Sequence, residues 1–218
     1  MLPDPWLRRW LPLLRDTAVP HPVLKIGCGI GDDTATLAGA GLSVVGFDLS
    51  EAAVAAARLR VPAASLDCSD LRDPFPVAHG SAGAIVASLS LHYFPWAETV
   101  GLVERIRLTL RHSGLLLCRL NSTEDRHFGA EGHPEIEPHF YLVDGQPKRF
   151  FDEADVDRLF RSGWQVLSKE HLSTRKYVRN KALWEIVLRR SDLDSGKLGD
   201  DLAPGTLNSI LKQASLKK

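Results

Sequence analysis

Short apolar runs alternate with helix-like stretches along roughly the first half of the chain. The first run, over 23–26, is followed by glycines at every second position and then by a helix-like stretch over 33–40. Further runs have the length and apolar character of buried strands, and they cover 42–48, 63–68, 83–93 and 115–120. Helix-like stretches separate them, so the pattern predicts a doubly wound α/β domain with a mostly parallel sheet.

The two ends of the chain add a helix and a closing pair of strands. Apolar positions at helical spacing over 5–15 predict a leading helix. Strand-like runs over 164–171 and 183–190 lie close together in sequence, which predicts an antiparallel pair that completes a seven-stranded sheet. We expect one domain over 1–190, with residues 191–218 as a polar appendage.

Charge and cysteine content narrow the classes of partner. Lys plus Arg and Asp plus Glu each number 27, so no basic field attracts nucleic acid. Three widely spaced cysteines indicate small buried residues in a reducing compartment rather than a disulfide framework. Arginines interrupt the apolar N-terminal residues, so neither a signal peptide nor a membrane span is predicted there. We expect a cytoplasmic monomer or homodimer that contacts neither nucleic acid nor membrane.

The glycine turn predicts a nucleoside ligand. A dinucleotide fingerprint would place its last glycine where this chain has Asp32, and Asp33 adds a second carboxylate. Both would repel a pyrophosphate, and a helix dipole contributes only about 0.3–1 kcal/mol against that repulsion. Asp48 ends the second predicted strand about 20 residues after the turn, where a carboxylate can accept from ribose hydroxyls. A nucleoside without phosphates fits best, and an NAD(P)-binding oxidoreductase is the alternative.

The segment over 24–31, Leu-Lys-Ile-Gly-Cys-Gly-Ile-Gly, resembles the first motif of class I S-adenosylmethionine (SAM)-dependent methyltransferases. The resemblance implies a Rossmann-like sheet of strand order 3-2-1-4-5-7-6 and SAM as cofactor. This chain has Lys25 where the family usually has an acid that helps to hold the methionine amino group. Three outcomes stay open: weaker cofactor binding, compensation by Asp32 or Asp33, or contact between Lys25 and the methionine carboxylate.

The resemblance also assigns cofactor contacts along the first four strands. Asp48 would bind the ribose, Leu49 would border the adenine, and an acid at the end of the third strand would accept from the adenine amine. Backbone after the fourth strand would line the methionine half of SAM. The residues implied are Gly27, Cys28, Gly29, Gly31, Asp33, Asp48, Leu49, Asp67, Cys68, Ala87, Ser88 and Leu89.

An insert over 121–151 distinguishes the chain on its substrate side. It shows neither strand nor helix periodicity, and a loop of that length is usually functional or disordered. The insert has Asn121-Ser122-Thr123, then Phe140-Tyr141, then Lys148-Arg149-Phe150-Phe151. This pattern resembles a bacterial subgroup that is grouped with tellurite-resistance-type methyltransferases. The substrate-binding candidates are Asn121, His127, Tyr141 and Arg149.

Histidine and cationic side chains supply the remaining candidates for chemistry. His92 lies just beyond the fourth strand and is a candidate catalytic base, with a purely structural histidine as the alternative. His127, His133 and His139 recur every six residues, which does not match zinc-ligand spacing, so no metal is predicted. The cations Lys148, Arg149, Arg175 and Lys176 are either ligands for an anionic substrate or solvated surface charges.

These patterns together predict a SAM-dependent methyltransferase acting on a small-molecule acceptor. A non-catalytic protein that binds SAM is a further alternative, suggested only by Lys25. Measured methyl transfer would distinguish the methyltransferase from the non-catalytic protein. A preference for SAM over NAD(P) would distinguish both from an oxidoreductase.

Overall fold

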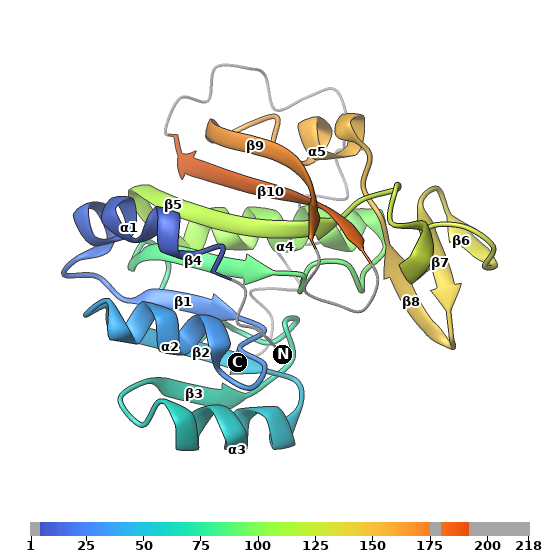
Figure 1. Ribbon diagram of the computed structural model, residues 1–218. Coiled ribbons are helices and arrows are strands. Elements are labelled where there is room, and N and C mark those ends of the chain that lie inside the picture. Colours follow the sequence, from blue (N-terminus) through green and yellow to red (C-terminus); the bar gives the residue numbers. More distant parts are fainter. Residues whose placement is uncertain (1–4, 175–179, 192–218) are drawn as a thin grey trace.

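A seven-stranded sheet forms the centre of the computed structural model, which describes residues 5–174 and 180–191 (Figure 1). The strand order is β3-β2-β1-β4-β5-β10-β9. Neighbouring strands are parallel from β3 to β5, and β10 runs antiparallel to both β5 and β9. Counted along the chain within this sheet, the order is 3-2-1-4-5-7-6. The predicted Rossmann-like fold is therefore confirmed.

The strands and helices alternate as the apolar pattern predicts. The strands of the large sheet are β1 (Val23–Ile26), β2 (Val44–Asp48), β3 (Ser65–Cys68), β4 (Ala82–Ser88), β5 (Leu110–Asn121), β9 (Trp164–Thr174) and β10 (Lys181–Arg190). The helices are α1 (Leu11–Ala18), α2 (Asp32–Gly39), α3 (Glu51–Arg60), α4 (Trp96–Thr109) and α5 (Glu153–Leu159), with short 3-10 turns η1 (Arg8–Trp10) and η2 (Arg126–Phe128).

Helices cover both faces of the sheet because alternate strand residues point to opposite sides. One face packs against α4 and α5 through a cluster that includes Leu24, Ile85 and Ile106. The opposite face packs against α1 and α2 through a second cluster that includes Leu14 and Leu37. Helix α3 lies beside α2 and contacts β2 and β3. Both faces of the central strands are thus buried, which explains why their sequences read as continuous apolar runs.

Two helix boundaries differ from the expected ones. The leading helix over 5–15 is instead the turn η1 followed by α1. The sequence also predicts a helix that starts at Pro95 and ends at Gly114, but α4 ends at Thr109, because the fully buried Leu110 already belongs to β5. In contrast, Ser50 caps α3 by accepting from the Ala53 amide at 3.3 Å, as a capping residue is expected to do.

The insert is not an irregular loop, and this corrects the sequence prediction. Its strands β6 (Glu135–Glu137), β7 (Phe140–Val143) and β8 (Gln146–Arg149) form a small antiparallel sheet. Asp144 and Gly145 both have positive φ and make the tight turn between β7 and β8. The small sheet stands beyond the carboxyl ends of β4 and β5, separate from the large sheet (Figure 1).

The predicted appendage over 191–218 lies outside the described residues except for Ser191, so that boundary stays a prediction. Within the described ranges, no helix is long and apolar enough to cross a membrane.

Candidate cofactor and substrate site

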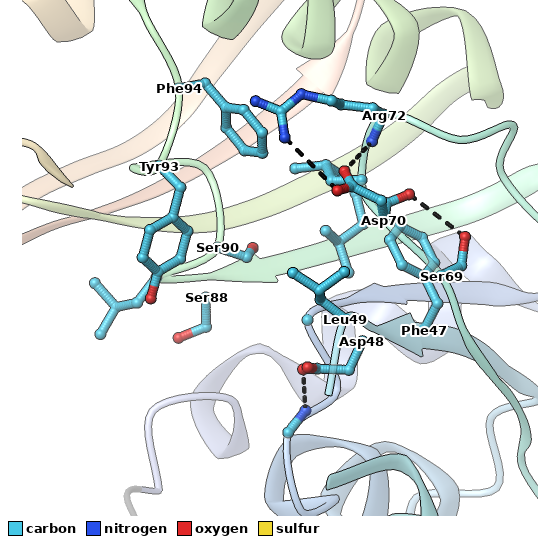
Figure 2. Close-up of a pocket in the computed structure, with 15 residues that line it drawn as sticks. Phe47, Asp48, Leu49, Ser69, Asp70, Arg72, Ser88, Ser90, Tyr93 and Phe94 are labelled. Atoms are coloured by element: carbon cyan, nitrogen blue, oxygen red, sulfur yellow. Dashed lines mark hydrogen bonds and ion pairs between the residues drawn. The ribbon is translucent and has the colours of Figure 1, made fainter. Parts of the chain in front are cut away.

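A cavity of about 280 Å³ opens where the carboxyl ends of β1, β2 and β4 meet the loop after β3. Parallel α/β sheets bind ligands at this edge, because strand ends and loops converge there. Figure 2 shows Tyr93, Ser88 and Ser90 on one side of the cavity and Leu49, Asp70 and Arg72 on the other. Its lining consists of Ile26, Gly27, Gly29, Phe47, Asp48, Leu49, Ser69, Asp70, Leu71, Arg72, Ser88, Leu89, Ser90, Tyr93 and Phe94.

The Asp48 carboxylate is fixed in the cavity by two backbone amides. Its Oδ2 accepts from the Gly29 amide at 2.8 Å (Figure 2). Its Oδ1 accepts from the Ser50 amide at 3.0 Å. Gly29 has a φ of 51°, a conformation that glycine adopts without the steric cost of a side chain. A carboxylate offers about four acceptor positions, so each oxygen keeps capacity for a further donor. Asp48 can therefore accept from two hydroxyls of a ligand without moving.

Lys25 lies behind the cavity instead of lining it. Its side chain is 2% exposed, and its ammonium donates to the carbonyls of Ile26 and Gly27 at 3.0 and 2.9 Å. It also forms an ion pair with Asp33 at 3.4 Å, and the Trp6 indole donates to the other Asp33 oxygen at 3.0 Å. Of the three outcomes left open for Lys25, the structure shows charge compensation by Asp33.

Half of the predicted cofactor residues line the cavity. These are Gly27, Gly29, Asp48, Leu49, Ser88 and Leu89. They come from the glycine turn and from the ends of β2 and β4, and Leu89 has a positive φ of 54° that carries the chain around the cavity edge.

The other predicted residues close to the glycine turn have packing or ion-pair contacts away from the cavity. Cys28 packs into a small cluster beneath α3. A side chain at Gly31 would come within 3.2 Å of Ala57, so this glycine allows α3 to pack closely. Asp33 pairs with Lys25, and Ala87 is completely buried within β4.

The acid predicted at the end of the third strand also lies away from the cavity lining. Asp67 is half-exposed and faces Arg58 at 3.5 Å. Cys68 is exposed rather than buried, which corrects the expectation for that cysteine. The lining instead contains Ser69 and Asp70, two residues further along the chain.

The loop after β3 contributes a wall that the sequence prediction missed. Asp70 accepts from the Arg72 amide at 2.8 Å, a short-range turn that fixes the loop. The Arg72 guanidinium donates to Glu98 at 2.6 and 3.2 Å and lies 4.7 Å from the centre of the Phe94 ring. The signal was present as an Asp-x-Arg sequence directly after the third apolar run. This wall combines an aromatic ring, an acid and a guanidinium.

His92 is not among the residues that line the cavity. It is 5% exposed, and its ring centre lies 4.0 Å from that of Tyr93, which does line the cavity. Burial, with smaller contributions from the charges of Lys148 and Lys181, holds the pKa of His92 well below its usual value of 6.5. The ring is therefore neutral in the folded protein at neutral pH.

This neutral histidine predicts a loss of stability in mild acid. Below about pH 6.5 the unfolded chain binds a proton at His92, whereas His92 in the folded chain stays unprotonated. The free energy of unfolding therefore falls as the pH falls. The slope from one such group is at most about 1.4 kcal/mol per pH unit. Urea unfolding of wild type and His92→Gln between pH 7 and 5 measures it, and the other histidines cancel in the comparison. Parallel curves for the two proteins would contradict the assignment.

The four predicted substrate residues do not converge on one surface. Asn121 is fully buried and donates from Nδ2 to the carbonyl of Arg149 at 3.3 Å. Arg149 is 1% exposed and engaged with the protein through its own donors. Tyr141 lies in β7 with its ring 6.1 Å from that of Phe150, and His127 is exposed on η2. Asn121 and Arg149 are therefore engaged with other protein groups, and Arg175 and Lys176 lie outside the described residues.

One histidine of the insert approaches two acids. His139, Asp152 and Asp155 offer ligand atoms within 4.8 Å of one another. The same atoms already form protein hydrogen bonds, because His139 Nδ1 and Asp155 Oδ2 are 2.7 Å apart and both acids form the capping box of α5. The Asp-x-x-Asp spacing of Asp152 and Asp155 predicts such a helix cap, and the cap explains why these side chains lie together.

Comparison with known proteins shows what the chain is similar to. Residues 23–114 match the family model of a methyltransferase domain. A curated relative, an uncharacterized methyltransferase of Synechocystis sp., is 30% identical over 93 residues. That alignment covers 43% of this chain and only 43% of the relative's length.

Solved structures share the fold over most of the chain. A SAM-dependent methyltransferase from Methanosarcina mazei has a TM-score of 0.69 at 16% identity, covering 82% of this chain and 97% of that one. Magnesium protoporphyrin IX methyltransferase from Synechocystis, solved with bound SAM, has a TM-score of 0.60 at 18% identity, covering 85% and 77%. The chain thus shares its fold with SAM-dependent methyltransferases, and its residues 23–114 match a methyltransferase domain.

Proposed function

We propose that this chain transfers a methyl group from SAM to a small-molecule acceptor. The observation that carries the proposal is the Asp48 carboxylate, which two backbone amides hold in an open cavity with capacity left for two hydroxyl donors. A ribose offers two adjacent hydroxyls. The cavity continues from Asp48 to Asp70 and the Phe94 ring on one side and to Ser88 and Tyr93 on the other, which suits a nucleoside with an extended tail.

The protein's part in such a reaction is mainly positional. Bound SAM supplies an electrophilic methyl group on a sulfonium, and the acceptor must approach in line with the bond that breaks. Holding two reactants in a near-attack arrangement contributes about 7–11 kcal/mol, without any proton transfer. The buried position of His92 agrees with this mechanism, since amines and thiolates need no strong base to attack. Tyr93, 48% exposed at the cavity, is placed to contact an incoming acceptor.

The charges around the glycine turn disfavour a dinucleotide in the same place. Asp32 and Asp33 open α2, where a pyrophosphate would need unpaired backbone amides and no nearby anion. Arg60 and Lys25 pair with these acids and lower their repulsion, but they do not add net positive charge. The neutral balance at this helix end therefore favours a ligand without phosphates.

Calorimetry with SAM, S-adenosylhomocysteine and NADH tests the proposal. We expect micromolar binding of both SAM-type ligands and none of NADH. Lys25→Glu provides an internal comparison: because Lys25 is satisfied within the protein, we expect the wild type to bind at least as well as this variant. Binding of NADH instead, or of none of the three, would overturn the cofactor assignment. Binding without methyl transfer to any compound in an acceptor screen would favour the non-catalytic alternative.

A further inference from the structure

Two lysine ammonium groups approach one aromatic ring where the insert meets the large sheet. Lys148, on β8, donates to the carbonyl of Phe128 at 2.6 Å, and its Nζ lies 5.9 Å from the centre of that ring. Lys181, at the start of β10, has its Nζ 4.9 Å from the same ring centre. Lys148 also lies 5.4 Å from the Phe150 ring. Two like charges thus share one aromatic ring.

The positive charge here exceeds the negative charge. Lys181 forms a buried ion pair with Asp125, whose Oδ2 is 2.8 Å away. Within the described part of the chain, no carboxylate lies within 4.0 Å of the Lys148 ammonium. The pKa of Lys148 is lowered, first by burial and then by Lys181, although Asp125 and Asp144 act in the opposite direction. A half-buried ammonium without a counter-charge is costly, and a bound anion would remove that cost.

His92 completes the group and connects it to the cavity. Its Nδ1 is buried without a hydrogen-bond partner among the described residues, which is unusual for a buried polar atom. The Arg149 amide donates to the His92 carbonyl at 2.7 Å, which fixes the end of β8 against this residue. The His92 ring packs against the ring of Tyr93, which lines the cavity. The His92 ring therefore contacts a cavity residue and lies near enough to both lysines for their charges to lower its pKa.

We propose that His92, Lys148 and Lys181, here called the Lys148 cluster, bind an anionic group of the methyl acceptor, a carboxylate or a phosphate, while Asp125 stays paired with Lys181. The inference rests on the proposed function for the identity of the bound molecule as an acceptor. The anion would supply the counter-charge that Lys148 lacks and an acceptor for a proton on His92 Nδ1. The acceptor's nucleophile would then lie past Tyr93, toward the cavity. This makes the substrate a small molecule with an acid group at one end.

NMR of the histidine ring resonances tests the cluster in the full chain, saturated with S-adenosylhomocysteine. The two probes are inorganic phosphate and acetate. We expect saturable shifts of the His92 ring resonances with at least one probe, and the stronger probe identifies the acid group. Lys148→Met should weaken that binding about tenfold, the scale of one charge-assisted hydrogen bond, while Lys148→Arg should retain most of it. Arg126→Gln is the matched control, because Arg126 is an exposed cation of the same insert.

The outcomes separate this inference from the proposed function. Absence of a saturable His92 shift with both probes would overturn the anion site, as would equal weakening by Lys148→Met and Arg126→Gln. Failure of S-adenosylhomocysteine to bind, measured on the same samples, would count against the cofactor assignment alone. If Lys148→Met unfolds, the comparison of wild type with Lys148→Arg and Arg126→Gln still decides, because loss of binding in Arg126→Gln contradicts the cluster.

Discussion

Replacing Asp48 by alanine is expected to weaken S-adenosylhomocysteine binding by about two orders of magnitude. Hydrogen bonds to a charged group contribute about 1.5–3 kcal/mol each, and Asp48 has capacity for two from a ribose. The loss of about 3 kcal/mol corresponds to roughly a hundredfold change in Kd. Calorimetry on the wild type and the variant measures it. Asp48→Asn keeps one acceptor oxygen and should fall between the two.

Asp67→Ala is the matched control for this experiment. Asp67 is also an acid at the end of a strand, but it is half-exposed, faces Arg58 and lies outside the cavity lining. An exposed ion pair contributes about 0.2–1 kcal/mol to stability, so we expect nearly unchanged affinity and a similar melting temperature. A large loss of affinity in Asp67→Ala with little in Asp48→Ala would place the nucleoside elsewhere.

The half of the site that the sequence predicts depends on local backbone requirements. The glycine turn and Asp48 are readable because a buried strand, a positive-φ turn and an acid at the next strand end must occur together in this order. The register of β1 and β2 then aligns Ile26 with Phe47, next to Asp48. The fold follows from the same apolar runs, since strands buried on both faces need helices on both sides.

The other half depends on tertiary packing, which spacing does not encode. Asp67 and Asp70 both follow an apolar run, and only the course of the loop after β3 brings Asp70 to the cavity. The burial of His92 follows from β8, an element of the insert that the sequence prediction left without strands. Its Asp144-Gly145 pair was the available signal, because both residues favour the positive φ of a two-residue hairpin turn.

Replacing Arg149 by methionine is expected to have the largest effect on stability, about 3–5 kcal/mol, the usual range for breaking a buried ion pair. Its Nε donates to the Phe94 carbonyl at 3.0 Å, its Nη1 donates to the Pro138 carbonyl at 3.2 Å, and its Nη2 pairs with Glu137. Burial lowers its pKa to about 10, so the guanidinium is still charged at neutral pH. Urea denaturation measures the loss.

Arg158→Met provides the control that isolates burial from aromatic contact. Arg158 is exposed, yet its guanidinium lies 4.6 Å from the Trp96 ring, against 5.7 Å for Arg149. We expect it to cost less than about 1 kcal/mol, the range for an exposed cation on an aromatic ring. Equal losses in the two variants would contradict the role of the buried contacts.

The position of Arg149 also predicts that its loss affects ligand binding at the cavity. One side chain joins Phe94, a wall of the cofactor cavity, to Pro138 and Glu137 in the insert. Methionine is shorter and has no donors, so the Phe94 carbonyl would lose its Arg149 donor and keep only the Thr99 hydroxyl at 3.3 Å. We therefore expect Arg149→Met to weaken S-adenosylhomocysteine binding as well as folding, under conditions in which the variant is still folded. A destabilised variant with unchanged affinity would show that the insert and the cavity are held independently.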